Sequence, residues 1–385
     1  MLYSPSFLMM SIANLFTTAS LGCFFLFPLF ITGHGGTKAD IGIFMGAFTL
    51  SSVLCRPWIA DMVDRIGRRR SYGVGCIIML FLPFTYLLFT GELSSFYLAL
   101  ILVRILHGVG LAICFTAAFT YVTDIVPSDR LNEGIGMFGV TGLTGMALGP
   151  VFAEIIIQKY GFSAFFLFSS AMAALGFLFQ LRLPESFTNI NKEPASSFFT
   201  VFKRRKFLII FSLALLFGMG LSASGGFVAP YAREKHIAFV SVYYICYSGA
   251  AVLTRFMGGR LADRVGEGRI IPYAMILTGA GLLMLIFLKG NPVLMVSGFM
   301  TGCGHGFLFP CLNALAVRDE PLPIRGKING IFTGGIDGGV LVGSVALGYV
   351  GEWGGFQALF LAAGICLLAG IPVFRYLRGG TREVP

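Results

Sequence analysis

Long apolar runs alternate with short polar stretches from one end of the chain to the other. Each apolar run holds roughly 20 residues or more, which as a helix is enough to cross about 30 Å of hydrocarbon. The polar stretches are too short to form a separate soluble domain. The pattern predicts twelve membrane-spanning helices, here called spans one to twelve, at 7–32, 40–62, 72–91, 95–123, 134–158, 163–181, 207–232, 238–262, 271–288, 293–317, 327–351 and 357–375.

The composition supports an all-α integral membrane protein. Of 385 residues, 56% are hydrophobic and 12% are charged, and the mean hydropathy is +0.84. An ordinary soluble domain is about a quarter charged, so a soluble enzyme, a secreted disulfide scaffold, a disordered chain and a fibrous repeat are excluded. All eight cysteines fall inside the spans without metal-ligand spacing. We therefore expect small buried cysteines, no metal and no cofactor.

The net charge of +10 would suggest nucleic acid in a soluble protein. Here the basic residues concentrate in alternate loops: 20 of the 28 lie in segments on the side of the N-terminus, and 5 lie on the other side. Cytoplasmic loops carry an excess of Lys and Arg. The sequence predicts a multi-pass protein of the cytoplasmic (inner) membrane with both termini inside, in contact with membrane lipids and not with nucleic acid.

The two halves of the chain repeat each other. RPWIADMVDRIG begins at Arg56 and RFMGGRLADRVG begins at Arg255, and the shift of 199 positions that aligns them also carries Gly149 onto Gly348. Two similar six-helix halves are a known transporter architecture, with the solute site between them near the middle of the membrane. We predict two pseudo-symmetric six-helix bundles at 1–182 and 207–385, joined by a cytoplasmic linker at 183–206.

The repeated segment resembles the G-x-L-A-D-R-x-G-R-[RK] motif of the major facilitator superfamily (MFS), and the resemblance covers essentially the whole chain. In the first half, Ala60 replaces the usual glycine. The Asp64 carboxylate can sit at the positive N-terminus of span eleven, near Gly326, and would act as a cytoplasmic latch. The alternative is a solvated loop that orients the chain. The predicted latch residues are Asp64, Arg65, Gly67, Arg68, Asp263, Arg264 and Gly266.

Span five carries a glycine pattern, Gly136-x8-Gly145-x3-Gly149-Pro150, that resembles the antiporter motif of the same family. The terminal Gly-Gly pair of that motif is replaced by Ala153 and Glu154. The resemblance implies an exporter that exchanges substrate for protons. Small residues four apart allow close helix contact, which predicts that spans five and eight pack together and seal the inner route. Plain glycine packing is the alternative, and Glu154 is expected at the outer interface.

Arg104 and His107 lie three residues apart on span four, so they share a face. An Arg inside the membrane is costly and should face a cavity or a partner. The segment resembles the R-x-x-Q-G-x-G pattern of the family, which implies that Arg104 influences proton coupling. The alternatives are a structural Arg bonded to carbonyls and a packing histidine.

Asp337 on span eleven is the carboxylate predicted to lie near the middle of the membrane, and His305 is similarly deep in span ten. An ionisable group at this depth is a functional hypothesis by default. Asp337 is expected to bind a proton, a cationic solute, or both in turn. The alternative is a static ion pair with Arg104 or His305.

Other polar side chains inside the spans are candidates for a cavity lining. Ser and Thr can also be satisfied within their own helix, and Tyr is common at the membrane interface. The candidates are Asn14, Thr18, Ser222, Tyr243 and Tyr247.

Together these features favour a proton-coupled exporter of a small organic solute that works as a monomer by alternating access. An uptake symporter of the same fold is the first alternative, since the fold does not decide direction. A membrane-embedded enzyme is the distant one. It is disfavoured because none of the four histidines stands in a catalytic or metal-binding spacing.

Overall fold

The computed structural model describes residues 3–127, 130–186, 198–318 and 320–379. The side chains of 131–132, 198–199, 257–264, 322–323, 325–326 and 377–379 lie outside the described set. The described chain is helical throughout its spans, with no strand in these ranges, which confirms the predicted all-α class.

The helices of the first half follow the predicted spans. Span one bends through a short 3-10 turn (η1), and span three ends in another (η2). Spans five and six together form α6, which is broken at Gly161 (φ 78°). The bounds are α1 Pro5–Cys23, η1 Phe24–Leu26, α2 Phe27–Gly33, α3 Lys38–Ile66, α4 Arg68–Thr85, η2 Tyr86–Leu88, α5 Leu93–Ile125 and α6 Leu131–Gln180.

The second half repeats this order. Span seven is split into two helices. Spans eleven and twelve together form α13, which is broken at Gly355 (φ 75°). The bounds are α7 Phe198–Phe202, α8 Arg205–Gly226, α9 Val228–Glu234, α10 Ser241–Val265, α11 Glu267–Met284, η4 Leu285–Phe287, α12 Asn291–Val317 and α13 Leu322–Gly379.

Nine stretches among the described residues are long and apolar enough to cross a membrane. Two of them, 48 and 50 residues long, are each about twice the length that one crossing needs. They turn back at Gly161 and Gly355, so each makes two crossings. With α10, part of which lies outside the described side chains, the helices give the twelve predicted spans.

Local sequence explains where several helices begin and end. The Ser4 hydroxyl accepts from the Phe7 N–H at the start of α1, and Thr37 and Asp40 form a reciprocal capping box at the start of α3. Gly67 (φ 99°) and Gly266 (φ 87°) separate spans two and three and spans eight and nine. Positive φ favours glycine, so the repeated motif places the same turn in both halves.

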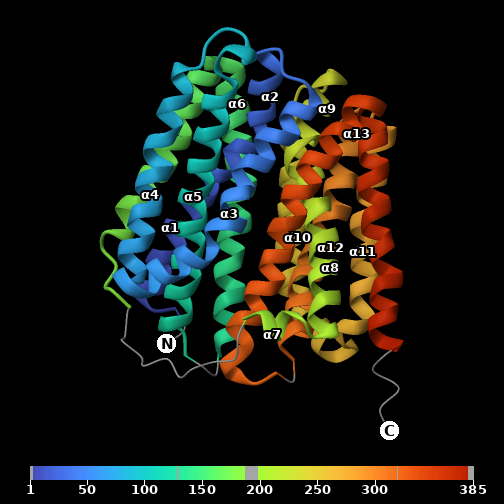
Figure 1. Ribbon diagram of the computed structural model, residues 1–385. Helices are drawn as coiled ribbons and strands as arrows, with labels where there is room; N and C mark the ends of the chain where they lie inside the picture. The colour runs from blue at the N-terminus through green and yellow to red at the C-terminus, as the bar shows by residue number, and fades with distance from the viewer. Residues whose placement is uncertain (1–2, 128–129, 187–197, 319, 380–385) are drawn as a thin grey trace.

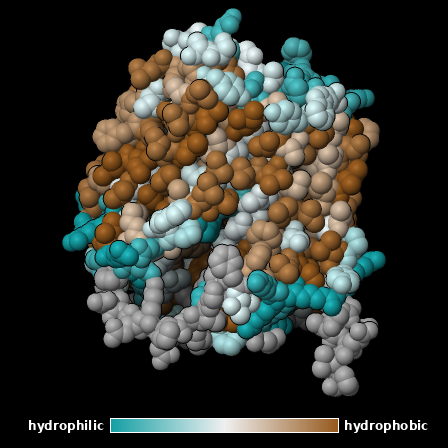
Figure 2. Space-filling model, viewed as in Figure 1, coloured by the Kyte–Doolittle hydropathy of each residue, from teal (hydrophilic) through white to brown (hydrophobic). Residues whose placement is uncertain are grey.

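The two bundles stand side by side (Figure 1). The start of α1, the short helix α7 and the end of α13 all lie at the same end of the molecule, which is called the terminal end below. The opposite end, near α2 and α9, is called the far end. The halves meet where α3 packs along α13 and α10 packs along α6. Apolar side chains cover the middle of the visible face, and hydrophilic ones gather toward both ends (Figure 2).

Candidate functional site

An ion pair joins the two halves inside the membrane. Arg56 on α3 pairs with Asp337 on α13, and its second terminal nitrogen donates to the Thr333 hydroxyl at 2.7 Å. Asp337 lies about 22 Å from the start of α13 and about 27 Å from its break, at 1.5 Å per residue. The two side chains remain 36% and 25% exposed. The pair is therefore near mid-span and partly exposed.

The sequence-based partners of Asp337 were wrong. Neither Arg104 nor His305 forms a described contact with Asp337, and the partner is Arg56. The sequence places Arg56 in the repeated segment and does not indicate its partner. Two small residues four apart on the same helix, Gly42 and Gly46, could have indicated the side of α3 that contacts another helix, and the structure places α13 there. Arg56 lies further along α3, toward the terminal end.

Arg104 is fully buried inside the first half, in a cage of aromatic rings. Its guanidinium carbon lies 4.4 Å, 4.6 Å and 5.5 Å from the ring centres of Phe48, Phe27 and Phe24. Its Nε donates to the Phe44 carbonyl at 3.3 Å. These contacts fit the structural alternative, and the role in proton coupling stays a prediction.

His107 lies beside that cage. Its Nδ1 is 3.2 Å from the Tyr86 hydroxyl, while its Nε2 and one terminal nitrogen of Arg104 are buried without a hydrogen-bond partner. The edge of its ring also contacts Phe24. His107 is therefore packed within one half and does not reach the interface between the halves.

In the second half, His305 and two tyrosines come together between α10 and α12. The His305 Nδ1 forms a hydrogen bond with the Tyr247 hydroxyl. The Tyr243 hydroxyl donates to Ser224 at 2.9 Å and lies 3.1 Å from the Thr301 hydroxyl. The sequence named His305, Tyr243 and Tyr247 separately, and the structure places them in one polar cluster.

The other cavity candidates bond locally. The Thr18 hydroxyl donates to the Asn14 carbonyl at 2.7 Å and the Ser222 hydroxyl to the Met219 carbonyl at 2.8 Å, each within its own helix. The Asn14 amide donates to Thr141 on α6 at 3.0 Å. Asn14 therefore links spans one and five of the same half.

The span-five glycines pack on span one. A Cβ at Gly149 would lie 2.8 Å from the Cys23 nitrogen, and one at Gly145 would lie 2.8 Å from the Ala19 nitrogen. Spans five and eight do pack together as predicted, since α10 lies along α6. Gly145 and Gly149 do not make that contact, because the backbone of α1 lies against them. The sealing of an inner route stays a prediction. Gly136 has open space around it, and Pro150 is buried within α6.

A different residue of span five, Gly139, faces span eight. A Cβ there would meet a terminal nitrogen of Arg255 on α10. The guanidinium carbon of Arg255 lies 5.6 Å from the Phe309 ring centre. The Arg255 Nε is buried without a hydrogen-bond partner. Arg255 is thus a second arginine at the interface between the halves.

The loop between spans two and three forms a compact charged cluster at the terminal end. Arg68 pairs with Asp64 at 3.4 Å and with Asp124 of α5 at 2.9 Å. Arg65 pairs with Asp61 at 2.9 Å. The sequence did not indicate Asp124, which lies far away along the chain.

The Glu185 carboxylate also joins this cluster, accepting from the backbone N–H groups of Arg68 and Arg69 at 2.8 Å and 3.2 Å. In the second half Gly266 forms the matching turn, whereas the side chains of Asp263 and Arg264 lie outside the described residues. The start of span eleven, where Asp64 was expected to act, also falls partly outside them, so the latch stays a prediction.

Two carboxylates hold the far end closed. Glu154 of α6 is 4% exposed and accepts from the backbone N–H groups of Val240 and Ser241 at 2.7 Å each. Glu352 of α13 accepts from the backbone N–H of Lys38 at 3.0 Å. Each carboxylate of one half therefore caps the first turn of a helix of the other half.

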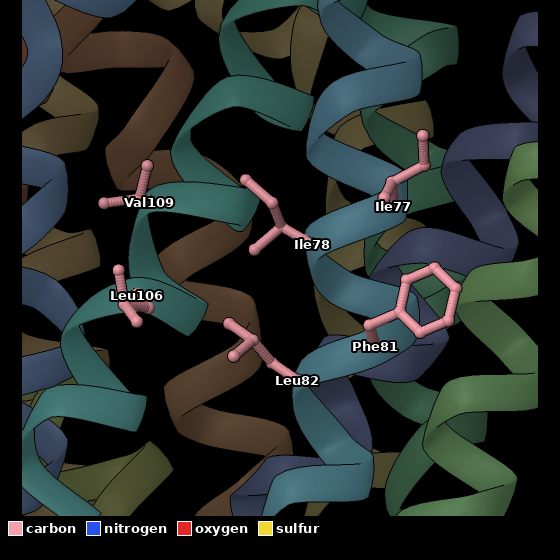
Figure 3. A pocket seen from close by; sticks show the side chains of 6 residues that line it. All are labelled: Ile77, Ile78, Phe81, Leu82, Leu106 and Val109. Carbon is pink, nitrogen blue, oxygen red and sulfur yellow. The ribbon is translucent and has the colours of Figure 1, made fainter. Parts of the chain in front are cut away.

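A shallow groove between α4 and α5 is lined only by apolar side chains (Figure 3). Several of them are largely exposed on the outside of the bundle. A solute site needs a few placed polar groups, so this groove fits lipid chains better than a polar solute. The lining residues are Ile77, Ile78, Phe81, Leu82, Leu106 and Val109. Among the described residues, no three His, Cys, Asp or Glu side chains are grouped as metal ligands.

Twelve crossings in two related halves, with ionisable side chains where the halves meet, are typical of a membrane transporter. The family model of the Major Facilitator Superfamily matches residues 8–270 and 238–385. The chain belongs to the major facilitator superfamily and is a multi-pass membrane transporter.

Relatives of similar length support this assignment. The chain is 26% identical over 392 residues to the multidrug resistance protein MdtG of Klebsiella pneumoniae, covering 92% of this chain and 91% of that protein. It is 24% identical over 382 residues to an uncharacterised MFS-type transporter of Methanocaldococcus jannaschii, covering 94% and 95%. A crystal structure of a mutant nucleoside transporter NupG superposes with a TM-score of 0.79 at 16% identity, covering 97% and 99%. That structural likeness shows the fold alone.

Proposed function

We propose that this protein is a proton-coupled exporter of a small organic solute in the cytoplasmic membrane of a prokaryote. It would work as a monomer with both termini inside, so that the terminal end is cytoplasmic. The observation that carries the proposal is the Arg56–Asp337 ion pair, which joins the halves at mid-membrane and remains partly exposed. Asp337 would bind the exchanged proton and Arg56 would hold its charged form.

The ion pair supplies a physical link between protonation and movement of the halves. A proton on Asp337 removes the charge that Arg56 binds, which weakens one contact between α3 and α13. Exposed pairs contribute about 0–1 kcal/mol, and breaking buried ones costs about 3–5 kcal/mol. The Arg56–Asp337 pair is of intermediate exposure, so its contribution should lie between these ranges. A change of about 1.4 kcal/mol is enough to alter the ratio of two conformations tenfold.

Export as the direction is supported by the MdtG relative and by the span-five glycine pattern. The bias of basic residues toward the terminal side supports the orientation. The second candidate is uptake by symport, because the same fold is found in the nucleoside transporter NupG and a fold does not fix the direction.

Proton movement in everted membrane vesicles tests the proposal. A pH-sensitive dye reports protons released when cationic, zwitterionic and anionic compounds are added. We expect at least one compound to release protons with the wild type and with Glu133→Gln, which changes an exposed carboxylate at the terminal end of α6. Asp337→Asn should abolish that release because it cannot exchange a proton.

Wild-type proton release by Asp337→Asn would remove Asp337 from the coupling mechanism. Proton and solute moving in the same direction would replace export with symport. Both variants should first show wild-type expression and a single peak in size-exclusion chromatography, so that lost activity is not lost folding.

A further inference from the structure

Arg255 is an arginine at the interface between the halves that the proposed function does not use. It lies about 21 Å from the start of α10 and about 15 Å from its end, at 1.5 Å per residue. The side chain is half-buried, and among the described residues no carboxylate pairs with it. Its Nε has no hydrogen-bond partner although it is buried. The guanidinium therefore keeps donor groups that the protein itself leaves unused.

The internal repeat shows what is missing. Arg255 is the equivalent of Arg56 under the shift of 199 positions. The same shift carries Asp337 onto Phe138, which is fully buried and packs edge-on against Phe119 at 5.2 Å. One arginine of the symmetric pair thus has a carboxylate across the interface, whereas the position equivalent to that carboxylate in the first half holds a phenylalanine.

At mid-span, away from the two carboxylates of the far end, this leaves two arginines and one carboxylate where the halves meet among the described residues, Arg56, Arg255 and Asp337. An unpaired charge inside a membrane protein is costly and marks a substrate or ion pathway by default. The planar guanidinium presents its donors as a fork that matches a carboxylate or phosphate group. The charge and the geometry both call for an anion at Arg255.

We propose that Arg255 binds the anionic group of the transported solute, a carboxylate or phosphate attached to an apolar body. As a statement about transport, this rests on the proposed function. Phe309 beside the guanidinium offers an aromatic wall for the apolar part. The hydrogen-bonded Tyr247 and His305 lie two turns further toward the far end of the same helix pair. Gly139 has no side chain, so a terminal nitrogen of Arg255 lies where a Cβ at this position would be.

Gly139 provides a matched pair of variants. A side chain at this position meets a terminal nitrogen of Arg255, the movable end of a long side chain. Gly139→Asp places a carboxylate against the guanidinium and should occupy it. Gly139→Asn has the same bulk without the charge. A difference between the two variants therefore reports charge and not crowding.

The experiment measures equilibrium binding by isothermal titration calorimetry, with the full-length protein in phosphatidylcholine nanodiscs. The probes are 2-naphthoate and 2-naphthylmethylammonium, which share a ring system and differ in charge. We expect the wild type to bind naphthoate at least about tenfold more tightly than the ammonium probe. Arg255→Gln and Gly139→Asp should each weaken naphthoate binding about tenfold or more. Gly139→Asn and Arg255→Lys should retain part of it.

Three results would overturn the proposal. The first is no naphthoate binding to the wild type at millimolar concentration. The second is unchanged affinity in both Arg255→Gln and Gly139→Asp, provided that both elute as single folded species. The third is loss of naphthoate binding when phosphatidylglycerol is added to the nanodiscs, which would assign the guanidinium to a lipid headgroup.

Because binding needs no proton gradient, the outcome is separable from the proposed function. Charge-selective naphthoate binding in a protein whose vesicles release no protons would contradict proton exchange and leave the anion site intact. Proton release by cationic compounds only, with no naphthoate binding, would support proton exchange and contradict the anion site.

Discussion

At the scale of single residues, charge is placed where the halves meet and is compensated unevenly. Asp337 is held by Arg56, whereas Arg255 stands beside glycine and phenylalanine. Arg104, which is fully buried, is surrounded by aromatic rings and one carbonyl within its own bundle. Depth in the membrane is therefore a poor guide to function here. What distinguishes these residues is the face of the helix on which they lie. Arg56, Arg255 and Asp337 face the other half, whereas Arg104 faces the interior of its own bundle.

A double-mutant cycle tests the coupling of Arg56 and Asp337. Arg56→Ala and Asp337→Ala each leave a charge without its partner, so each should lower the melting temperature in detergent. The double variant should lose less than the sum of the two, with a coupling of about 0.5–3 kcal/mol. Additive losses would mean that the pair contributes nothing to the resting structure.

At the scale of helices, two kinds of contact fix the arrangement: glycines within a half and carboxylate caps between halves. Gly145 and Gly149 bring α6 onto α1 inside one bundle. Glu154 and Glu352 each reach the first turn of a helix in the opposite bundle. The first kind of contact should affect folding, and the second should affect the balance between conformations.

Glu154→Gln should favour opening of the far end. The charged carboxylate accepts two backbone bonds, and bonds to charged groups contribute about 1.5–3 kcal/mol. Spin labels at Tyr160 and Trp353, which are exposed at the far end of the two halves, should report a longer distance population in the variant. Glu352→Gln, which loses a single bond, should shift the population less. Identical distance distributions for wild type and Glu154→Gln would refute the cap as a closing contact.

Gly149→Leu should destabilise the first half by wedging α6 away from α1, with a loss of the order of 1–3 kcal/mol or more. Gly136→Leu is the matched control, because no atom lies within 4 Å of a Cβ at that position. Thermal unfolding followed by circular dichroism compares them. Equal melting temperatures for the Gly149→Leu and Gly136→Leu variants would show that the close packing of Gly149 on α1 does not contribute to stability.

The sequence predicted the spans well because the thickness of the membrane fixes the length of each apolar run. It predicted a repeated motif between spans two and three and between spans eight and nine, and the structure places a glycine turn in each copy, at Gly67 and Gly266. The contacts of the site were harder to predict. The Arg56 side chain finds Asp337, and Glu154 finds the start of α10, only after the two bundles have docked. Hydropathy carries no information on which face of one span meets another, so those partners were missed.

At the scale of the whole molecule, the symmetry of the backbone is broken by the chemistry of the side chains. The two bundles share a turn motif, a glycine at equivalent positions and far-end carboxylate caps in nearly equivalent places. They differ at Phe138 and Asp337, and that difference leaves one arginine without a carboxylate partner at mid-span between the halves. A symmetric backbone can therefore move as two rigid halves, while the two halves contribute different charges to the site between them.

The unmatched arginine also has an electrical consequence. A proton moving in and a singly charged anion moving out carry charge in the same electrical direction, so each cycle would transfer two charges. The membrane potential contributes about 2.3 kcal/mol per charge per 100 mV, hence about 4.6 kcal/mol for this exchange. That corresponds to a concentration ratio of about 2000-fold. With a cation as cargo the two charges would cancel, and voltage would contribute nothing. The position that holds Phe138 instead of a second aspartate would then determine whether an energised membrane can drive export without any pH gradient.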